Sequence, residues 1–185
     1  STEELIKLNK LDEAESFLGE VLKHKPDEMN VFFQRGMIFL QRDQAENALK
    51  QFMAAYEKAP RSFDTLNNIG ATYYKLKRYD DAIAYYNKSL EIRPKTDYVL
   101  SAIGICYFRL GELDKAIECY RQCLELSPQQ ISHHSDLLLM MIYTESITPE
   151  QHAEETERLA KKLTQLFPAK SEFANEKNRL CCHRF

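Results

Sequence analysis

The chain of 185 residues carries 25 lysine and arginine residues against 28 aspartate and glutamate residues, a formal net charge of -3. This balance disfavours a nucleic-acid binder, and no apolar run approaches the roughly 18 to 20 residues that membrane insertion of a helix requires. With Gly 5 and Pro 6, the chain has too few turn residues for a sandwich or barrel, so a mainly helical fold is expected.

The first stretch, residues 1–28, has apolar residues at helical spacing. These residues are Leu5, Leu8, Leu11, Ala14 and Leu18. They fit a pair of helices whose first helix would begin before Ser1. Residues 1–28 are therefore predicted to be a partial unit, and our hypothesis is that the chain is a fragment of a longer array.

Residues 29–130 repeat with a period of 34 residues. The recurring positions hold Gly36, Gly70 and Gly104; Phe39, Tyr73 and Tyr107; Ala48, Ala82 and Ala116; Phe52, Tyr86 and Tyr120; and Pro60, Pro94 and Pro128. Within each period the apolar residues recur about every 3.6 residues, which predicts two helices per unit. The predicted units are 29–62, 63–96 and 97–130.

Each unit is expected to pack in the same way. The recurring glycines and alanines should let the two helices of one pair approach closely, while the large aromatics fill the space between successive pairs. Short breaks such as Lys77-Arg78 and Gly111-Glu112 should separate the helices. An acid should then open each second helix, where negative charge suits the helix dipole. These acids are Asp12, Glu46, Asp80 and Asp114.

After residue 130 the pattern changes. A further apolar helix is predicted from Ile131 to Thr144. Thr148 and Gln151 then form a capping box around Pro149, which predicts another helix that runs to Leu166. Residues 131–168 are therefore expected to be a divergent helix pair that completes an array over residues 1–168. Residues 169–185 are expected to be a short tail or a linker.

The recurring positions resemble the tetratricopeptide repeat family, and the segment from Leu66 to Pro94 is the closest to its pattern. The resemblance implies an all-α, right-handed superhelical solenoid of antiparallel helix pairs. It also implies a protein–protein interaction scaffold without enzymatic activity or cofactor, which binds a peptide or a partner helix in a concave groove lined by the first helix of each unit.

By this resemblance, the groove residues lie beside the recurring glycines. They are Asn30, Phe33, Gln34, Met37, Gln41, Asp64, Asn67, Asn68, Ala71, Tyr74, Lys75, Tyr98, Ser101, Ile105, Phe108, Arg109 and Asp136. Aromatic rings and amides together suit an extended peptide, because rings give contact area and amides can bond a backbone. In the alternative, Tyr74, Tyr98 and Phe108 only pack between helix pairs, or the protein's own tail fills the groove.

A second resemblance gives an alternative function. The run from His134 to Leu139, followed by Thr148-Pro149-Glu150, is similar to the junction between the repeats and the catalytic domain of O-GlcNAc transferase-like proteins. Asp136 replaces the asparagine of that family, whose groove ladder of asparagines survives here as Gln34, Asn68, Ala102 and Asp136. The alternative is a substrate-recognition arm of a larger glycosyltransferase.

Residues that bind metals or react as nucleophiles are expected to be structural here. His133 and His134 point about 100° apart on a helix, so a solvated or capping role is favoured over a shared metal. Cys123 occupies the position held by Ala55 and Ser89 in the other units, which indicates core packing. Cys181-Cys182-His183 lacks a second ligand pair, which leaves a flexible tail as the interpretation.

The remaining expectations concern partners and compartment. An odd number of cysteines, five in all, is unlike a secreted disulfide framework, so reduced thiols in the cytoplasm are expected. A protein or peptide is the expected partner, with no nucleic acid and no membrane insertion. Self-association through exposed end pairs is a further alternative, because the partial first unit would leave an apolar face uncovered.

Overall fold

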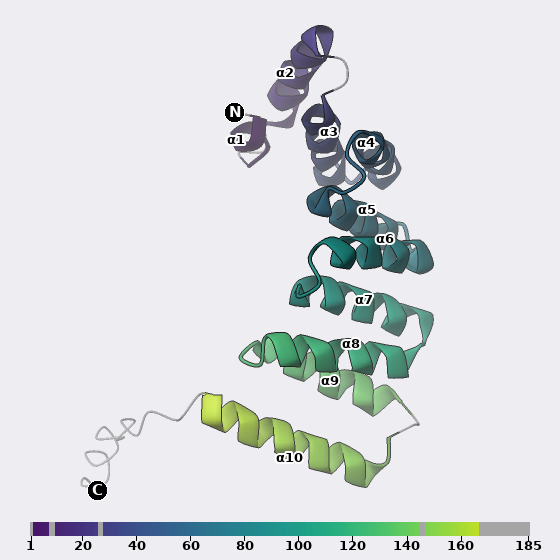
Figure 1. The fold of residues 1–185 in the computed structure, drawn as a ribbon, viewed down its shortest axis with the longest axis vertical. Coiled ribbons are helices and arrows are strands. Elements are labelled where there is room, and N and C mark those ends of the chain that lie inside the picture. Colours follow the sequence, from purple (N-terminus) through teal and green to yellow (C-terminus); the bar gives the residue numbers. More distant parts are fainter. Residues whose placement is uncertain (1, 8–9, 26–27, 145–146, 167–185) are drawn as a thin grey trace, which may run out of the picture. The chain divides into compact units, whose positions relative to one another are not determined.

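The computed structural model describes residues 2–7, 10–25, 28–144 and 147–166, and within them it contains ten helices and no strand (Figure 1). The helices are α1 (Thr2–Lys7), α2 (Leu11–His24), α3 (Met29–Gln41), α4 (Ala45–Lys58), α5 (Phe63–Lys75), α6 (Tyr79–Ile92), α7 (Asp97–Leu110), α8 (Leu113–Leu126), α9 (Ile131–Tyr143) and α10 (Pro149–Leu166). They fall into two compact units, which divide between Ser146 and Ile147. Among the described helices, none has both the length and the apolarity needed to cross a bilayer.

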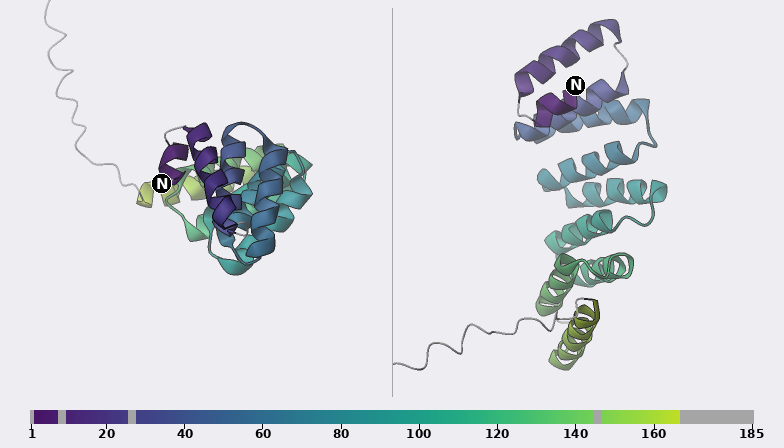
Figure 2. Two further views of the ribbon diagram at one scale, coloured as in Figure 1. Left: turned by 90° about the horizontal axis from the view of Figure 1, so that it is seen from above. Right: turned by 90° about the vertical axis from the view of Figure 1, so that its left-hand side faces the viewer.

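In the first unit, every helix packs on the next one along the chain, from α1 to α9. The pairs α3–α4, α5–α6 and α7–α8 stack in this order, as the three views show (Figures 1 and 2). Helices α5 and α7, the first helices of successive pairs, also contact each other directly. The predicted all-α solenoid of stacked antiparallel pairs is confirmed.

A left-handed residue ends the turn after each first helix. Asp43, Lys77 and Gly111 have φ angles of 59°, 60° and 78°. The residue that follows each of them donates its backbone N–H to the carbonyl five residues earlier, at 2.8 to 2.9 Å. This is the hydrogen bond of a Schellman motif, which satisfies a carbonyl left free at the helix end. The turn reverses the chain within three residues or fewer, so the second helix returns along the first.

The recurring glycines make room for an aromatic ring of their own helix pair. A methyl group at Gly36 would lie 2.5 Å from Cε1 of Phe52, and one at Gly70 would lie 2.8 Å from Cδ1 of Tyr86. Phe52 and Tyr86 are therefore seated on the first helix of their own pair, and Tyr86 also lies close enough to Cys106 on α7, in the next pair, for that thiol to affect its pKa. These distances are shorter than a carbon–carbon van der Waals contact, so only glycine leaves room for the buried ring at this position.

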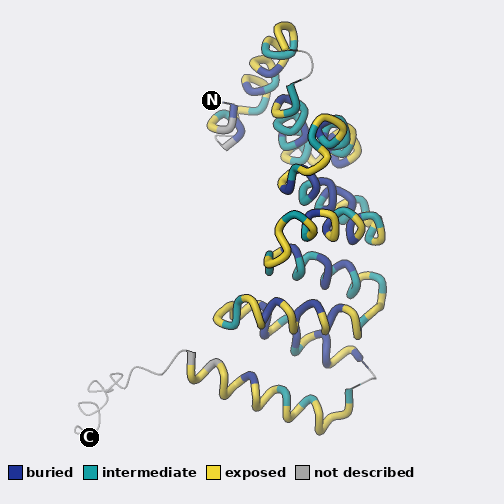
Figure 3. The backbone as a smooth tube through the Cα atoms, in the orientation of Figure 1, coloured by how far each residue is buried: buried dark blue, intermediate teal, exposed yellow. Residues whose placement is uncertain are grey.

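Other aromatic residues join one pair to the next. Tyr56 on α4 and Tyr85 on α6 meet edge to face, with ring centroids 5.9 Å apart. Phe63 on α5 and Tyr98 on α7 meet in the same way at 6.3 Å. Buried and exposed residues alternate along each helix of this unit, as expected of helices packed on two neighbours (Figure 3). The core thus runs continuously through the stack.

The second helices begin with acids, as predicted. Asp12, Glu46, Asp80 and Asp114 each lie in the first turn of α2, α4, α6 or α8. None of these helices has a side-chain hydrogen bond from its N-cap residue. The acid in the first turn therefore supplies the negative charge that favours a helix start, through the dipole and the exposed amides.

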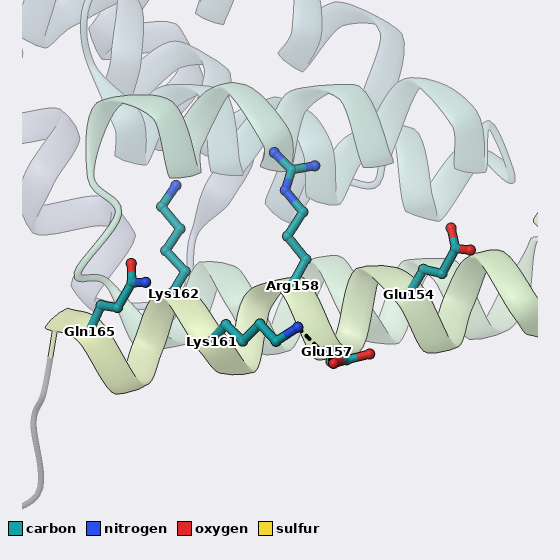
Figure 4. A pocket seen from close by; sticks show the side chains of 6 residues that line it. All are labelled: Glu154, Glu157, Arg158, Lys161, Lys162 and Gln165. Carbon is teal, nitrogen blue, oxygen red and sulfur yellow. Dashed lines mark ion pairs between the residues drawn. The ribbon is translucent and has the colours of Figure 1, made fainter.

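The second unit contains α10, which starts with the predicted capping box. The backbone N–H of Thr148 donates to Oε1 of Gln151 at 2.9 Å, and the N–H of Gln151 donates to Oγ1 of Thr148 at 3.3 Å. One side of α10 is lined by charged and amide side chains, among which Lys161 and Glu157 form an ion pair of 2.8 Å (Figure 4). The predicted end of this helix at Leu166 is confirmed.

Candidate functional site

The predicted groove residues lie on α3, α5, α7 and α9, and the structure buries none of them. Residues on the opposite side of the same helices are buried, for example Val31, Leu66, Val99 and Leu137. This division follows from helical geometry, because residues three or four apart share one side of a helix. We call the accessible side of these four helices, with the predicted residues on it, the first-helix face.

Contacts across the first-helix face connect one unit to the next. The ring of Phe108 on α7 lies 5.9 Å from that of Tyr143 on α9. The guanidinium of Arg109 lies close enough to the hydroxyl of Tyr74 on α5 for this hydroxyl to raise the pKa of Arg109. These contacts hold the surfaces of α5, α7 and α9 together as one continuous face.

The aromatic residues of this face therefore have a structural role as well. Tyr74 packs on Tyr79 of its own pair at 5.6 Å, and Phe108 packs on Tyr143. Phe108 therefore packs between helix pairs, as the alternative drawn from the sequence has it, whereas this ring contact of Tyr74 lies within its own pair. Tyr98 is different, since it touches Phe63 with one edge while about half of its surface stays exposed.

The exposed large apolar residues of the first-helix face lie on α7 and α9. Tyr98 is 53% exposed, Leu139 43%, Ile142 67% and Tyr143 59%. Leu139 and Tyr143 lie on one side of α9, since they are four residues apart. Large apolar side chains left together in water are typical of a surface that binds another molecule.

Several polar groups that the sequence offered for binding are already in use. The ammonium of Lys75 pairs with the carboxylate of Asp43 at 2.7 Å, across the boundary between two units. The amide nitrogen of Asn68 donates to the carbonyl of Asp64 at 2.8 Å, one turn earlier in the same helix. Lys75 and Asn68 thus support the scaffold. The ion pair with Asp43, which lies in the turn after α3, was not predicted from the sequence.

Two carboxylates of the face have no ion pair among the described residues, namely Asp64 on α5 and Asp136 on α9. Asp64 is exposed, whereas Asp136 is half-buried. Burial raises the pKa of Asp136, and the neighbouring His133 opposes this effect. The carboxylate of Asp136 is therefore an uncompensated charge in a partly apolar place.

The adjacent histidines are buried, with 6% and 2% of their surfaces exposed, so the solvated role expected for them is wrong. Nε2 of His134 lies 2.8 Å from the carbonyl oxygen of Pro128, just after α8, which agrees with the capping alternative. Nε2 of His133 faces Oδ2 of Asp97 at 3.6 Å. The neighbouring helix pair supplies these partners, and for that reason the local sequence did not predict the burial.

The described cysteines are packing residues. Ala55, Ser89 and Cys123 occupy equivalent positions and are all fully buried, which confirms the core role of Cys123. Burial raises the pKa of Cys106 and Cys123 to about 12 and that of Cys119 to about 11, so these thiols stay protonated at neutral pH. Within the described residues, no three His, Cys, Asp or Glu side chains are placed to hold a metal. The predicted tail and Cys181-Cys182-His183 lie outside these residues.

Residues 27–95 and 61–129 match a family model described as tetratricopeptide repeat. Together the two matched ranges cover more than half of the chain. The chain belongs to the tetratricopeptide repeat family. No curated protein matches it as a whole. The units of this tetratricopeptide repeat chain that match the model are those in which glycine, alanine and aromatic positions recur.

Solved structures share the fold. A MamA fragment from Desulfovibrio magneticus RS-1 is 20% identical with a TM-score of 0.76, and the match covers 91% of this chain and 93% of that one. Another MamA crystal structure is 16% identical, with a TM-score of 0.78 and coverage of 89% and 95%. YrrB, titled a TPR protein with an unusual peptide-binding site, is 17% identical, with a TM-score of 0.71 and coverage of 91% and 84%. These matches lend no support to the glycosyltransferase alternative.

Proposed function

We propose that this chain is a protein-interaction scaffold that binds a polypeptide segment on its first-helix face. The observation that carries the proposal is the group of exposed apolar side chains on α7 and α9, namely Tyr98, Leu139, Ile142 and Tyr143. Covering such side chains removes apolar surface from water, at about 25 cal/mol per Å², and aromatic rings contribute most per residue. A bound peptide or helix would gain this energy.

The rest of the stack supports the proposal by making the face rigid. Each ring seated on a glycine fixes the two helices of one pair, and the Phe63–Tyr98 and Phe108–Tyr143 contacts fix α7 against its neighbours. A preformed surface loses little conformational entropy when it binds, which favours affinity. Binding of this kind requires no chemical step, in agreement with thiols that stay protonated.

The repeat boundaries belong to the proposal too. We take 29–62, 63–96 and 97–130 as complete units, residues 1–28 as a partial unit and 131–168 as a divergent pair within an array over 1–168. The peptide-binding site in the printed title of YrrB is a property of that protein, and by analogy it favours a peptide ligand here. A reducing compartment such as the cytoplasm is also proposed, supported by three free, buried cysteines.

A selection from a random peptide library tests the function. The whole chain and a Tyr98→Ala/Ile142→Ala variant are used as targets in parallel, and the enriched peptides should bind the parent at least tenfold more tightly than the variant. The matched control is Phe17→Ala/Leu126→Ala, which also removes two exposed apolar residues, but from the second helices α2 and α8.

The control variant should bind the enriched peptides within twofold of the parent. Thermal unfolding should be similar for all three proteins, because exposed residues contribute little to stability. If the Tyr98→Ala/Ile142→Ala variant binds the enriched peptides as well as the parent does, the binding surface lies elsewhere and the proposal is wrong.

A further inference from the structure

Two rows of side chains on α7 and α9 form one surface. Tyr98, Ile105 and Phe108 are spaced at three or four residues, or sums of these, along α7, and Asp136, Leu139 and Tyr143 follow the same rule along α9. We call these six residues the α7–α9 surface. The Phe108–Tyr143 ring contact joins the two rows near the ends of their helices.

The other end of the α7–α9 surface is joined through Tyr120 on α8. Ser101 on α7 and Asp136 on α9 both lie close enough to the Tyr120 hydroxyl to affect its pKa, which Ser101 lowers and the charge of Asp136 raises. Asp136 therefore lies near Tyr120, and helical spacing puts it on the side of α9 that also carries Leu139 and Tyr143.

Among the described residues, His133 is the group whose charge lowers the pKa of Asp136. Within this part of the chain no hydrogen bond and no ion pair is formed by the Asp136 carboxylate, although it is half-buried. His133, one turn earlier on α9, faces Asp97 at 3.6 Å. Arg109, a cation on the exposed side of α7, lies near the Tyr74 hydroxyl of α5, which raises the pKa of Arg109. The charge of Asp136 remains available to a ligand.

We propose that the α7–α9 surface selects a polypeptide segment in which a lysine or arginine is flanked by apolar residues, with the basic group paired to Asp136. This inference rests on the proposed function and names the chemistry of its ligand. A half-buried carboxylate without a partner has already lost part of its hydration, so an ion pair with a ligand gains more than one in open water. The apolar neighbours cover Leu139 and Tyr143.

Asp136 is the charged residue of its row of equivalent positions. The equivalent residues of the other units are Gln34, Asn68 and Ala102, none of which is charged. The ligand's basic residue therefore has one place to bind along this row, and its apolar residues follow α7 and α9 from there. Charge pairing of this kind sets the register and the choice of partner more than the total affinity.

The experiment uses peptides selected on the whole chain from a random library, labelled with fluorescein and measured by fluorescence polarisation. The peptides should be enriched in lysine or arginine next to apolar residues. One such peptide and its copy with the basic residue replaced by glutamine are then measured against the parent and Asp136→Asn. Asp136→Asn should weaken the basic peptide about fivefold and change the glutamine peptide less than twofold.

The matched control is Asp64→Asn, which makes the same change on the first-helix face at an exposed position of α5. It should alter binding of the basic peptide less than twofold. Asp136→Asn should unfold at the same temperature as the parent or a higher one, since it removes an unpaired, half-buried charge. A loss of binding is then not a loss of fold.

The possible results separate the two proposals. Peptides enriched in acidic residues, equal weakening of both peptides by Asp136→Asn, or an equal effect of Asp64→Asn would overturn the assignment of a basic ligand and leave the scaffold function intact. If no enriched peptide depends on Tyr98 and Ile142, the scaffold function fails first, and the assignment fails with it.

Discussion

Replacing Gly70 by alanine tests the packing that we derive for each helix pair. The new methyl group would lie 2.8 Å from Cδ1 and Cε1 of the Tyr86 ring, whereas carbon atoms pack best at about 3.5 to 4.0 Å. The ring is rigid and almost fully buried, so α5 and α6 would have to move apart. Overpacking of this kind costs about 1 to 3 kcal/mol, and the better helix propensity of alanine returns about 1 kcal/mol.

The other glycines supply a graded series. At Gly36 the methyl group would approach Phe52 to 2.5 Å, so we expect the largest loss of stability there, about 2 kcal/mol net. At Gly104 the nearest atoms are 3.1 and 3.2 Å away, and the two effects should nearly cancel. At Gly19, on the exposed side of α2, nothing lies within 4 Å, and alanine should stabilise by about 0.5 to 1 kcal/mol.

Urea unfolding followed by far-ultraviolet circular dichroism measures this series. The midpoint should rise for Gly19→Ala, stay near the parent for Gly104→Ala, and fall for Gly70→Ala and further for Gly36→Ala. Equal denaturant slopes would show that the variants unfold the same structure. If Gly70→Ala is stabilised as much as Gly19→Ala, helix propensity decides the outcome and close contact with Tyr86 is not the reason for glycine at this position.

Two further predictions concern the turns and the thiols. Lys77→Gly should stabilise the chain by about 1 kcal/mol in urea unfolding, because a side chain is strained at a φ of 60°, and Gly111→Ala should destabilise it by a similar amount at 78°. In a Cys181→Ser/Cys182→Ser background, the remaining thiols should react with iodoacetamide at pH 8 only as the chain unfolds. Because the folded pKa values, about 11 to 12, exceed the usual thiol value, unfolding at pH 7 to 8 should be insensitive to these thiols, and stability should fall as the pH rises above about 9. Rapid alkylation of the folded chain at pH 8 would contradict their burial.

The helix pairs could be predicted because the sequence repeats the same packing three times. Glycine, alanine and aromatic residues recur at one spacing, and each recurrence reports the same contact between helices. The partner of each glycine was harder to predict, because spacing alone does not say whether Tyr86 turns toward Gly70 or toward the next pair. The overlap at Gly70 decides this point only once the two helices are placed.

The left-handed turn residue was not predicted from the sequence for a physical reason. Of the residues at this position, Gly111 adopts a positive φ without strain because it has no Cβ atom, while the side chains of Asp43 and Lys77 are strained there. The bonds from Gln44 to Phe39 and from Arg78 to Tyr73 hold them in that conformation. The hydrogen bonds that close the turn between the two helices thus outweigh the preference of Asp43 and Lys77 for a negative φ.

The candidate site was predicted less completely than the fold. Helical spacing correctly gave the accessible side of each first helix, since exposure follows from the periodicity within one helix. The neighbours of Lys75 and Arg109, namely Asp43 and Tyr74, come from the preceding repeat unit, and they depend on how neighbouring units are stacked. Contacts between side chains of different units could therefore be found only from the structure. They distinguish the residues that support the face from those that remain available to a ligand.

The same repetition explains where specificity can arise in this fold. A position that packs helices must hold nearly the same residue in every unit, as Ala48, Ala82 and Ala116 do, because each one is fully buried against an equivalent neighbour. A position on the first-helix face whose side chain contacts no other helix can change from one unit to the next with little loss of stability. Asp136 stands in a row of this second kind. The residues that recur in every unit thus make the stack rigid, and the residues that differ between units determine which ligand binds.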